Sequence, residues 1–428
     1  MKRGRVALLL CTLLLPLLLG GCWDKREVEQ IAYVIALGVD ESEQEGMLDV
    51  TYLIENPQVG SSDVGATENE PAAEQVTLTV PDWLTMRDTA EAVVSREIDF
   101  SHTRILLVGE EAARSGQLFP FLLGSLRDEQ MSQGINLVVT RERASDFLQR
   151  NRPELETRPH KYYDLMALRW KANGMLSHAP LVRFHYRVTQ EELFLAVYAT
   201  TEEFPDDPQR GQEDDYLPGE IAERGGQRGN RAQFIGVAVF REGKMIGSLT
   251  GEEVRIVHFL KRMPWSGDMF ARFPDPLSEG DSIAVRVVKS RRSRIEVDIN
   301  HAPAPRIAVT VPVHVELLSI PSQINYASDP KKQEDLRRFL QQAMAAKAEA
   351  LVKKTQQEFR GEPFLWVLEV RRHFWTWPDF ENYHWAEQYP QADVKVKVEV
   401  TFTGFGKQSA PQPYQRQLMK KVEEGSES

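Results

Sequence analysis

Cys22 is the side chain with the clearest chemical role in this sequence. The chain has two cysteines, and the other, Cys11, lies in an apolar stretch, residues 6–19, that follows a short basic start. A basic start and a short apolar core are typical of a secretory signal peptide, whereas a helix that spans a bilayer needs about 20 apolar residues. Cleavage after residue 21 would leave Cys22 as the first residue and the only thiol. We therefore expect a signal peptide over residues 1–21 and no disulfide in the mature chain.

The residues before Cys22 suit the covalent attachment of a lipid. The sequence Leu19-Gly20-Gly21-Cys22 resembles a bacterial lipobox, in which the cysteine thiol receives a diacylglyceryl group and becomes the mature N-terminus. Glycine at the middle position is less common there than alanine or serine. Two acyl chains, at about 0.8 kcal/mol per buried CH₂, hold a protein stably on a membrane. We expect lipidation of Cys22 and attachment to the extracytoplasmic face of a membrane.

Other residues with reactive side chains do not form a known catalytic or metal-binding pattern. There are nine histidines, but none lies in a His-Glu-x-x-His motif, and the closest approach to a metal-binding pattern is His373 with His384, in a segment crowded with aromatic side chains. The acidic run from Asp40 to Glu45 lacks the spacing of an EF-hand and is expected to be a solvated hairpin tip. No nucleophile elbow or phosphate-binding glycine loop is present. We expect no enzymatic activity, no cofactor and no metal site.

Composition limits the class of protein. The 428 residues are 42% hydrophobic and 27% charged, with a net charge of -11. These values fit a globular protein of two or three domains and exclude a disordered chain, a collagen-like repeat and a multispan membrane protein. An anionic body repels phosphate backbones, so nucleic acid is not expected as a partner.

The first half of the mature chain, residues 22–202, predicts an α+β domain in which helices pack on a mixed sheet. The apolar run Ile31–Asp40 and its hairpin partner Met47–Ile54 come first, and a polar loop over 56–75 follows. Thr189-x-x-Glu192 is typical of a helix capping box. The remaining elements alternate along the chain: strand 76–80, helix 82–97, strand 104–109, helix 110–126 and strand 135–140.

The second half begins after residues 203–231, a segment rich in Pro, Asp, Gly and Gln that we expect to be a disordered linker and the best domain boundary. Residues 232–405 predict a second α+β region, with a further division near 264–282. Thr250-x-x-Glu253 indicates a capping box, and Pro312 is expected to place its strand, 307–318, at an edge or bulge. The expected elements are hairpin 234–247, strands 283–289, 294–299 and 394–400, and a long helix 331–359; a polar tail, 406–428, ends the chain.

Aromatic side chains are densest shortly before the last strand, with Arg371 and Arg372 among them. Trp and Arg are common anchors of protein interfaces, so this segment is a candidate docking surface, although large aromatics more often fill a core. His102 is a second candidate contact, for which a buried, hydrogen-bonded position is the alternative. The aromatic residues are Phe364, Trp366, Phe374, Trp375, Trp377, Phe380, Tyr383 and Trp385.

Several blocks of the mature chain together resemble the GerAC/Ger(x)C family of spore germination lipoproteins. The most specific are Cys22-Trp23-Asp24 and the strand that ends in Gly38-Val39-Asp40. Ser101–Ala112, Leu126-Arg127-Asp128 and Ile235–Phe240 agree with the same family. The resemblance implies three α+β domains and a non-enzymatic C subunit of a nutrient germinant receptor. It further implies a lipid anchor on the outer face of the inner spore membrane, and integral-membrane A and B subunits as partners.

Two other functions compete with this one. A lipid-anchored solute-binding protein would deliver a small molecule to a transporter and would have two doubly wound lobes around a cleft. The expected hairpins and the alternating strand Val394–Val400 instead suggest antiparallel sheets. A surface hydrolase would need clustered acids, or a nucleophile with a base, that are far apart in the sequence.

Overall fold

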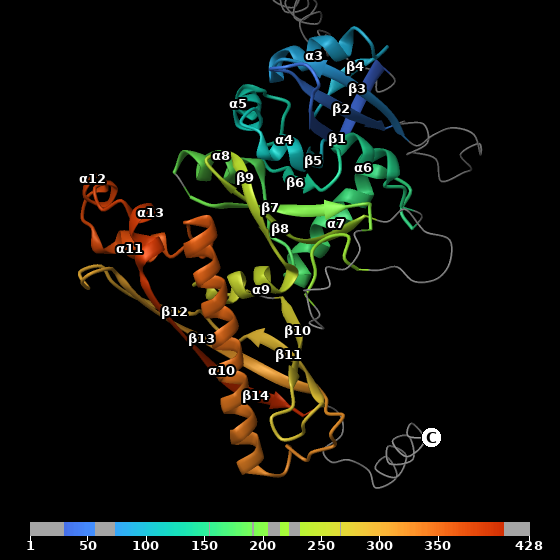
Figure 1. Ribbon diagram of the computed structural model, residues 1–428. Helices are drawn as coiled ribbons and strands as arrows, with labels where there is room; N and C mark the ends of the chain where they lie inside the picture. The colour runs from blue at the N-terminus through green and yellow to red at the C-terminus, as the bar shows by residue number, and fades with distance from the viewer. Residues whose placement is uncertain are drawn as a thin grey trace, which may run out of the picture.

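The computed structural model describes two β-sheets and two hydrophobic cores (Figure 1). The second core also takes in residues of the first sheet, among them Leu195, Val239 and Leu249. Cys22 with the whole of 1–21, residues 56–72 and the tail 406–428 lie outside the described residues. None of the described helices is both long enough and apolar enough to cross a membrane. The described ranges are 30–55, 73–153, 155–190, 192–203, 215–221, 232–265 and 267–405.

The first sheet has nine strands and mixed pairing. Its order is β3-β2-β1-β5-β6-β7-β8-β9, with the short β4 beside β1. Strands β1, β5, β6 and β7 run parallel, and the remaining long strands are joined by antiparallel hairpins. All five residues of β5 are buried, as expected of a parallel strand covered on both faces. The bounds are β1 Ile31–Glu41, β2 Leu48–Glu55, β3 Ala73–Val80, β4 Glu97–Asp99, β5 Ile105–Gly109, β6 Asn136–Thr140, β7 Phe194–Thr200, β8 Gln233–Arg241 and β9 Lys244–Leu249.

The helices of this half are shorter than their sequence patterns predicted. Helix α3 ends at Glu91 instead of continuing to residue 97, because Glu97–Asp99 pairs with β1. The predicted helix 110–126 is interrupted at Ser115, whose backbone is extended. Thr189 is the last residue of α8, so the capping box expected there is wrong. The bounds are α3 Trp83–Glu91, α4 Glu110–Arg114, α5 Leu118–Leu123, η2 Gly124–Arg127, α6 Ala144–Arg150, α7 Pro159–Asn173 and α8 Leu181–Thr189.

The first sheet continues across the predicted linker, residues 203–231. Strand β7 before this segment pairs with β8 after it, and Thr200 lies opposite Gln233. Part of the segment, residues 215–221, packs against α9 (Gly251–Leu260): Asp215 accepts hydrogen bonds from the Thr250 hydroxyl, 2.6 Å, and the Glu252 amide, 3.0 Å. The two sheets therefore part further along the chain, between β9 and β10, which is nearer the predicted division at 264–282.

The capping box at the start of α9 is confirmed. The Thr250 hydroxyl accepts from the Glu253 amide, and the Glu253 carboxylate accepts from the Thr250 amide at 2.9 Å. Two acids of the first turn of α9 hold the long helix α10 (Pro330–Lys354) against it. Glu252 pairs with Lys347 at 2.8 Å, and Glu253 pairs with Lys354 at 2.8 Å. The short helix α9 thereby connects the two halves of the molecule.

The second sheet has five strands around a central β13. Strands β12 and β11 pair with successive parts of one side of β13, and β14 pairs with the other side. Pro312 lies in this central strand, in continuous register with Glu399 of β14, so the prediction of an edge or a bulge was wrong. It falls between Thr310, the last partner of β12, and Val313, the first partner of β11. The bounds are β10 Asp268–Pro274, β11 Ser282–Lys289, β12 Arg294–Asp298, β13 Arg306–Ser319 and β14 Asp393–Gly404.

The last strand and the long helix keep their predicted patterns. Val396, Val398 and Val400 of β14 are buried, and Lys395 and Lys397 are exposed. However, β14 runs parallel to β13, so the antiparallel pairing suggested for it is wrong. The core stripe of α10 is confirmed: Leu336, Leu340, Ala348, Leu351 and Val352 are buried, and Phe339 and Met344 pack beside them. The α+β class with mixed and antiparallel pairing is confirmed, and it is built from two sheets.

Short helices follow α10 and carry the aromatic segment. A π-helical turn, Thr355–Phe359, extends α10 directly. The pieces after it lie at the left of Figure 1, beside the start of β13. Their bounds are α11 Val367–Val370, η4 Arg371–His373, α12 Trp377–Glu381, α13 Trp385–Gln388 and η5 Tyr389–Gln391.

Candidate functional site

The order of the first sheet reverses at β1, because the chain builds β2 and β3 on one side and then returns to place β5 on the other. In open α/β sheets, ligands commonly bind at the carboxyl ends of the strands at such a reversal. Here the Asp40 side chain occupies that position. Its carboxylate accepts hydrogen bonds from the Ala144 and Ser145 amides, at 2.6 and 3.0 Å, at the first turn of α6.

Asp40 is 1% exposed, so the prediction that it belongs to a solvated hairpin tip was wrong, whereas Glu43 and Glu45 are exposed. Burial raises the pKa of the Asp40 carboxyl, and the α6 amides and Arg143 act against that rise. A Cβ on Gly109 would lie 2.4 Å from the Asp40 carboxylate, so only glycine fits at this end of β5. The position at the carboxyl end of β1, where the strand order reverses, is thus occupied by the Asp40 carboxylate rather than open to a solute.

A second buried charge lies at the C-terminus of a different helix, α9. Lys289, at the end of β11, is 4% exposed, and its ammonium donates to the carbonyls of His258 (3.3 Å), Lys261 and Met263 (2.9 Å). The Ser293 hydroxyl donates to Phe259, and the Trp366 indole to Leu260 at 3.1 Å. These side chains satisfy the carbonyls that the end of α9 leaves without helical partners. They attach the second sheet and the aromatic segment to α9.

A groove of about 370 Å³ lies between the first half of the molecule and the short helices of the aromatic segment. Tyr186 and Glu192 belong to the first half, at the end of α8 and just before β7. Arg371, Trp377 and His384 lie on the opposite side. The full lining is Tyr186, Thr189, Gln190, Glu192, Leu193, Gly361, Glu362, Val367, Leu368, Arg371, Trp377, Phe380, Glu381, His384, Trp385, Ala386, Glu387 and Tyr389.

Glu362 is the buried acid of this groove. Its carboxylate accepts from the Phe364 and Val367 amides, both at 2.7 Å, and so holds the turn that begins α11. Burial raises the pKa of Glu362 to about 7, and the nearby Glu192 adds to the rise. Because both carboxylate oxygens are already engaged by the backbone, Glu362 stabilises the wall of the groove.

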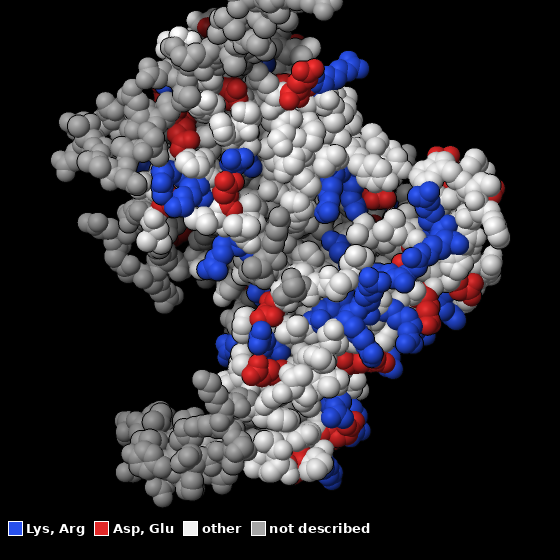
Figure 2. All heavy atoms as spheres, turned by 180° about the vertical axis from the view of Figure 1, so that it is seen from behind, with Lys and Arg blue, Asp and Glu red and all other residues white. Residues whose placement is uncertain are grey.

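The aromatic segment divides between the core and the surface. Phe364 and Trp366 are fully buried and Trp385 is 7% exposed, which confirms the core alternative for these residues. Trp375 is fully exposed and Trp377 is 38% exposed, and the Arg371 guanidinium lies 4.4 Å from the centre of the Trp377 ring. Seen from behind, Lys and Arg gather in a band on the side that carries α11, β12 and β13 (Figure 2). The exposed part of the segment therefore borders a basic surface.

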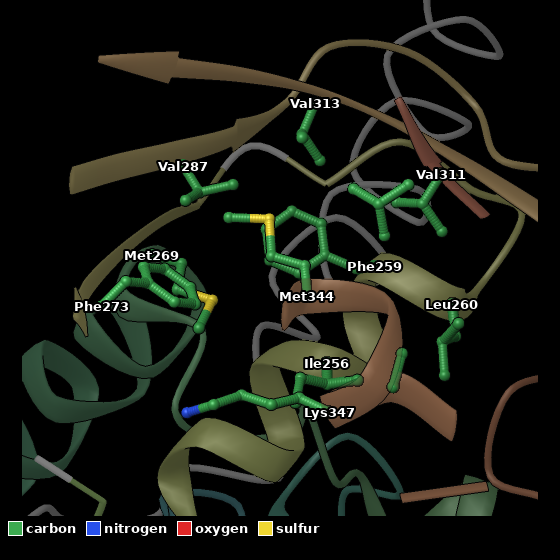
Figure 3. Close-up of a pocket in the computed structure, with 12 residues that line it drawn as sticks. Ile256, Phe259, Leu260, Met269, Phe273, Val287, Val311, Val313, Met344 and Lys347 are labelled. Carbon is green, nitrogen blue, oxygen red and sulfur yellow. The ribbon is translucent and has the colours of Figure 1, made fainter. Parts of the chain in front are cut away.

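The second core contains a small apolar cavity between α9, α10 and the sheet (Figure 3). Its volume is about 40 Å³, and Met269, Met344 and Phe259 lie against it. Lys347 borders the cavity, but its ammonium binds the Glu252 carboxylate at 2.8 and 2.9 Å. An apolar space of this size is too small for an amino acid or a sugar and stays dry. We assign it to core packing.

The predicted histidines lie on the surface. His102 is exposed and stands edge-on to Tyr33, with ring centres 4.5 Å apart, so the buried alternative for it was wrong. His373 and His384 are also exposed. Across the part of the chain that the structure describes, His, Cys, Asp and Glu side chains form no group of three or more that could hold a metal ion. Sequence reasoning missed Asp40 and Lys289, because their roles depend on helices distant along the chain.

Family models match both halves of the chain. A model of the spore germination protein N-terminal domain matches residues 24–200, and a model described as "Spore germination B3/ GerAC like, C-terminal" matches residues 235–406. The gap between the two matches, residues 201–234, includes the predicted linker. The first sheet nevertheless continues across this gap, because β7 pairs with β8.

Individual relatives agree with the family models. Spore germination protein B3 of Bacillus subtilis is 21% identical over 406 residues, which cover 91% of this chain and 95% of that protein. Spore germination protein KC of the same organism is 28% identical over 136 residues, 31% and 32% of the two chains. The crystal structure of the GerBC protein aligns with 88% of this chain and 100% of its own, with a TM-score of 0.52 at 15% identity, and so shares the fold.

Together these matches and the two-sheet α+β fold define a spore germination protein. The chain belongs to the GerAC-like family, which confirms the resemblance found in the sequence. This is a family of spore germination proteins rather than a known family of enzymes.

Proposed function

We propose that this chain is the C subunit of a nutrient germinant receptor, without enzymatic activity of its own. Lipid on Cys22 anchors it to the extracytoplasmic face of the cytoplasmic membrane, which becomes the inner membrane of the spore. It acts through contacts with the integral-membrane A and B subunits. The observation that carries the proposal is the match of both halves to spore germination domains, directly after the Leu19-Gly20-Gly21-Cys22 sequence.

Two places where a solute could be expected to bind are closed to one. The reversal of the first sheet, where a doubly wound protein would bind a ligand, is filled by Asp40. The cavity of the second core is small and apolar. The groove between the first half of the molecule and the aromatic segment offers surface for protein partners. A lipid tether would raise the local concentration of such partners, so modest affinities would suffice.

The test is the substitution Cys22→Ala in the sporulating host. We expect the variant to leave the membrane fraction and the nutrient response to be lost, while germination triggered without receptors stays normal. Cys11→Ala is the matched control, because Cys11 lies in the segment expected to be removed, and it should change neither property. Mass spectrometry of the mature chain should find a diacylglyceryl group on Cys22. A full nutrient response with unlipidated Cys22→Ala would contradict the proposal.

Association with the A and B subunits needs a separate measurement. We expect affinity purification of this chain from detergent-solubilised spore membranes to recover both subunits. Calorimetry with amino acids and sugars should show no tight binding to the isolated chain. Tight binding of a nutrient, without recovery of either subunit, would favour the solute-binding alternative.

A further inference from the structure

The connection between β11 and β12 carries an unusual density of positive charge. It reads Lys289-Ser290-Arg291-Arg292-Ser293-Arg294, four basic residues of six. Arg291, Arg292 and Arg294 are exposed. Their side chains form no ion pair or hydrogen bond with any residue that the structure describes. Three adjacent guanidinium groups are thus available to a partner.

Packing explains why these arginines point away from the core. Lys289 and Ser293 turn inward and donate to carbonyls at the end of α9. The connection is held at both ends by these bonds, which leaves Arg291 and Arg292 on the outside, and Arg294 is exposed at the start of β12. Because a buried lysine and a buried serine fix the backbone, the arginines are presented by a rigid support.

Basic and aromatic side chains of the neighbouring segment extend this surface. Helix α11 contacts β12, and the exposed residues Arg371 and Arg372 follow α11 directly. Glu369 pairs with both Arg372 and Arg262, at 2.7 and 2.6 Å. We call the surface made of Arg291, Arg292, Arg294, Arg371 and Arg372 the basic face; Trp375 and Trp377 lie beside it.

We propose that the basic face docks on the anionic phospholipid headgroups of the membrane that carries the protein. Guanidinium groups bind phosphate with paired hydrogen bonds, and exposed tryptophan rings favour the headgroup level of a bilayer. The chain as a whole has a net charge of -11, so an anionic bilayer repels the molecule as a whole and attracts it at a basic surface. The proposal rests on the proposed membrane attachment at Cys22, which would bring the basic face within reach of lipid.

The position of this face gives the protein an orientation. The described chain begins beside β4, at the top of Figure 1, and α11 and β12, next to which the arginines of the basic face lie in the sequence, are at the left. A tether at the first place and headgroup contacts at the second would lay the long axis of the molecule along the bilayer. An upright molecule would be held by its tether alone.

Vesicle sedimentation of the complete mature chain, with Cys22→Ser so that no lipid is attached, tests the docking directly. We expect binding to vesicles of 30% phosphatidylglycerol in phosphatidylcholine, little binding to pure phosphatidylcholine, and release on raising NaCl from 0.1 to 0.5 M. Each basic residue near such a surface contributes about fivefold in affinity. Arg291→Gln, Arg292→Gln and Arg294→Gln together should weaken binding at least tenfold.

The matched control removes three positive charges elsewhere, at the start of α10, by Lys331→Gln, Lys332→Gln and Arg338→Gln. It should change binding less than twofold. Brominated phospholipid should quench the fluorescence of the parent chain more than that of Trp375→Phe. Equal melting temperatures of the variants show that each is folded.

The proposal is overturned by equal binding to neutral vesicles, by absence of binding to anionic ones, or by equal losses in the two triple variants. Loss of binding to the A and B subunits without loss of vesicle binding would assign the basic face to protein. The vesicle assay contains neither receptor subunits nor the lipid on Cys22. Its failure is therefore distinguishable from failure of the proposed function, which the Cys22→Ala experiment reports.

Discussion

Asp40 and Lys289 are both buried charges that satisfy the end of a helix, but they join different parts of the molecule. Asp40 holds the N-terminus of α6 against β1 within the first sheet, and Lys289 holds the C-terminus of α9 against the second sheet. Each sign matches the helix end that it meets, since N-termini favour anions and C-termini favour cations. A buried charged side chain at a helix end thus stabilises the interior of one half at Asp40, and the contact between the two halves at Lys289.

The two sites differ in how closely they are packed. Asp40 has a glycine, Gly109, pressed against its carboxylate, and its two amide partners are adjacent in sequence. Lys289 reaches three carbonyls with a long flexible side chain and shares the task with Ser293 and Trp366. We therefore expect the Asp40 site to tolerate change less well than the Lys289 site.

The largest effect should come from Asp40→Ala. It leaves the buried Ala144 amide and the partly buried Ser145 amide without acceptors and opens space beside Gly109, so the free energy of unfolding should fall by about 4 kcal/mol. Urea unfolding followed by circular dichroism measures the change. Glu43→Ala, on the exposed turn that follows β1, is the control and should stay within about 0.5 kcal/mol. A change as small as this for Asp40→Ala would show that Asp40 does not stabilise the start of α6.

Lys289→Met comes next. Methionine keeps the aliphatic length but leaves the α9 carbonyls without their ammonium donor, at an expected loss of about 2–3 kcal/mol in unfolding free energy. Lys395→Met, at an exposed position of β14, should have almost no effect. If the Lys289 variant lost more stability than the Asp40 variant under the same conditions, the ranking drawn from packing would be reversed.

Glu362 gives a third buried charge with a defined pH dependence. Its pKa is about 7 in the folded protein and near 4.5 when unfolded, so the folded state binds more protons between these values. Its contribution to stability therefore falls as pH rises from about 4.5 to about 7, by up to about 3 kcal/mol. Melting curves of Glu362→Gln and of the parent chain across this window should diverge in slope. Glu387→Gln, exposed in the same groove, should follow the parent.

The smallest effect should come from Trp366→Phe. It keeps a buried ring but removes the indole donor to the Leu260 carbonyl, at a cost of about 1 kcal/mol. Combining it with Lys289→Met measures whether the donors at the end of α9 act together. A double variant that loses more than the sum of the two single losses would show coupling, and simple additivity would show independent bonds.

Local patterns were sufficient to predict much of the secondary structure. The Ile31 hairpin, the Thr250 capping box, the stripe of α10 and the alternation of β14 each depend on residues close in sequence. Pairing between strands far apart in the sequence was not predicted, or for β14 was predicted with the wrong direction, because it depends on distant partners. The pairing of β7 with β8 across 203–231, and the parallel pairing of β14 with β13, are examples.

The same distinction separates the predicted and the missed parts of the site. The aromatic segment was noticed from composition, but its division between buried Trp366 and exposed Trp375 required the fold. Asp40 was misassigned because an acidic run beside a turn is usually solvated, and only its distance to Ala144 shows otherwise. Lipidation of Cys22 remains a prediction, as does the basic face.

The pairing of Thr200 with Gln233 makes the surface beside these strands a convenient attachment point for a reporter. The polypeptide leaves the β-sheet and re-enters it at neighbouring positions. A fluorescent protein with adjacent termini, inserted in the connection between Thr200 and Gln233, would therefore leave the pairing of β7 with β8 in place. Such a fusion would allow individual receptors to be counted in living spores without altering either end of the polypeptide.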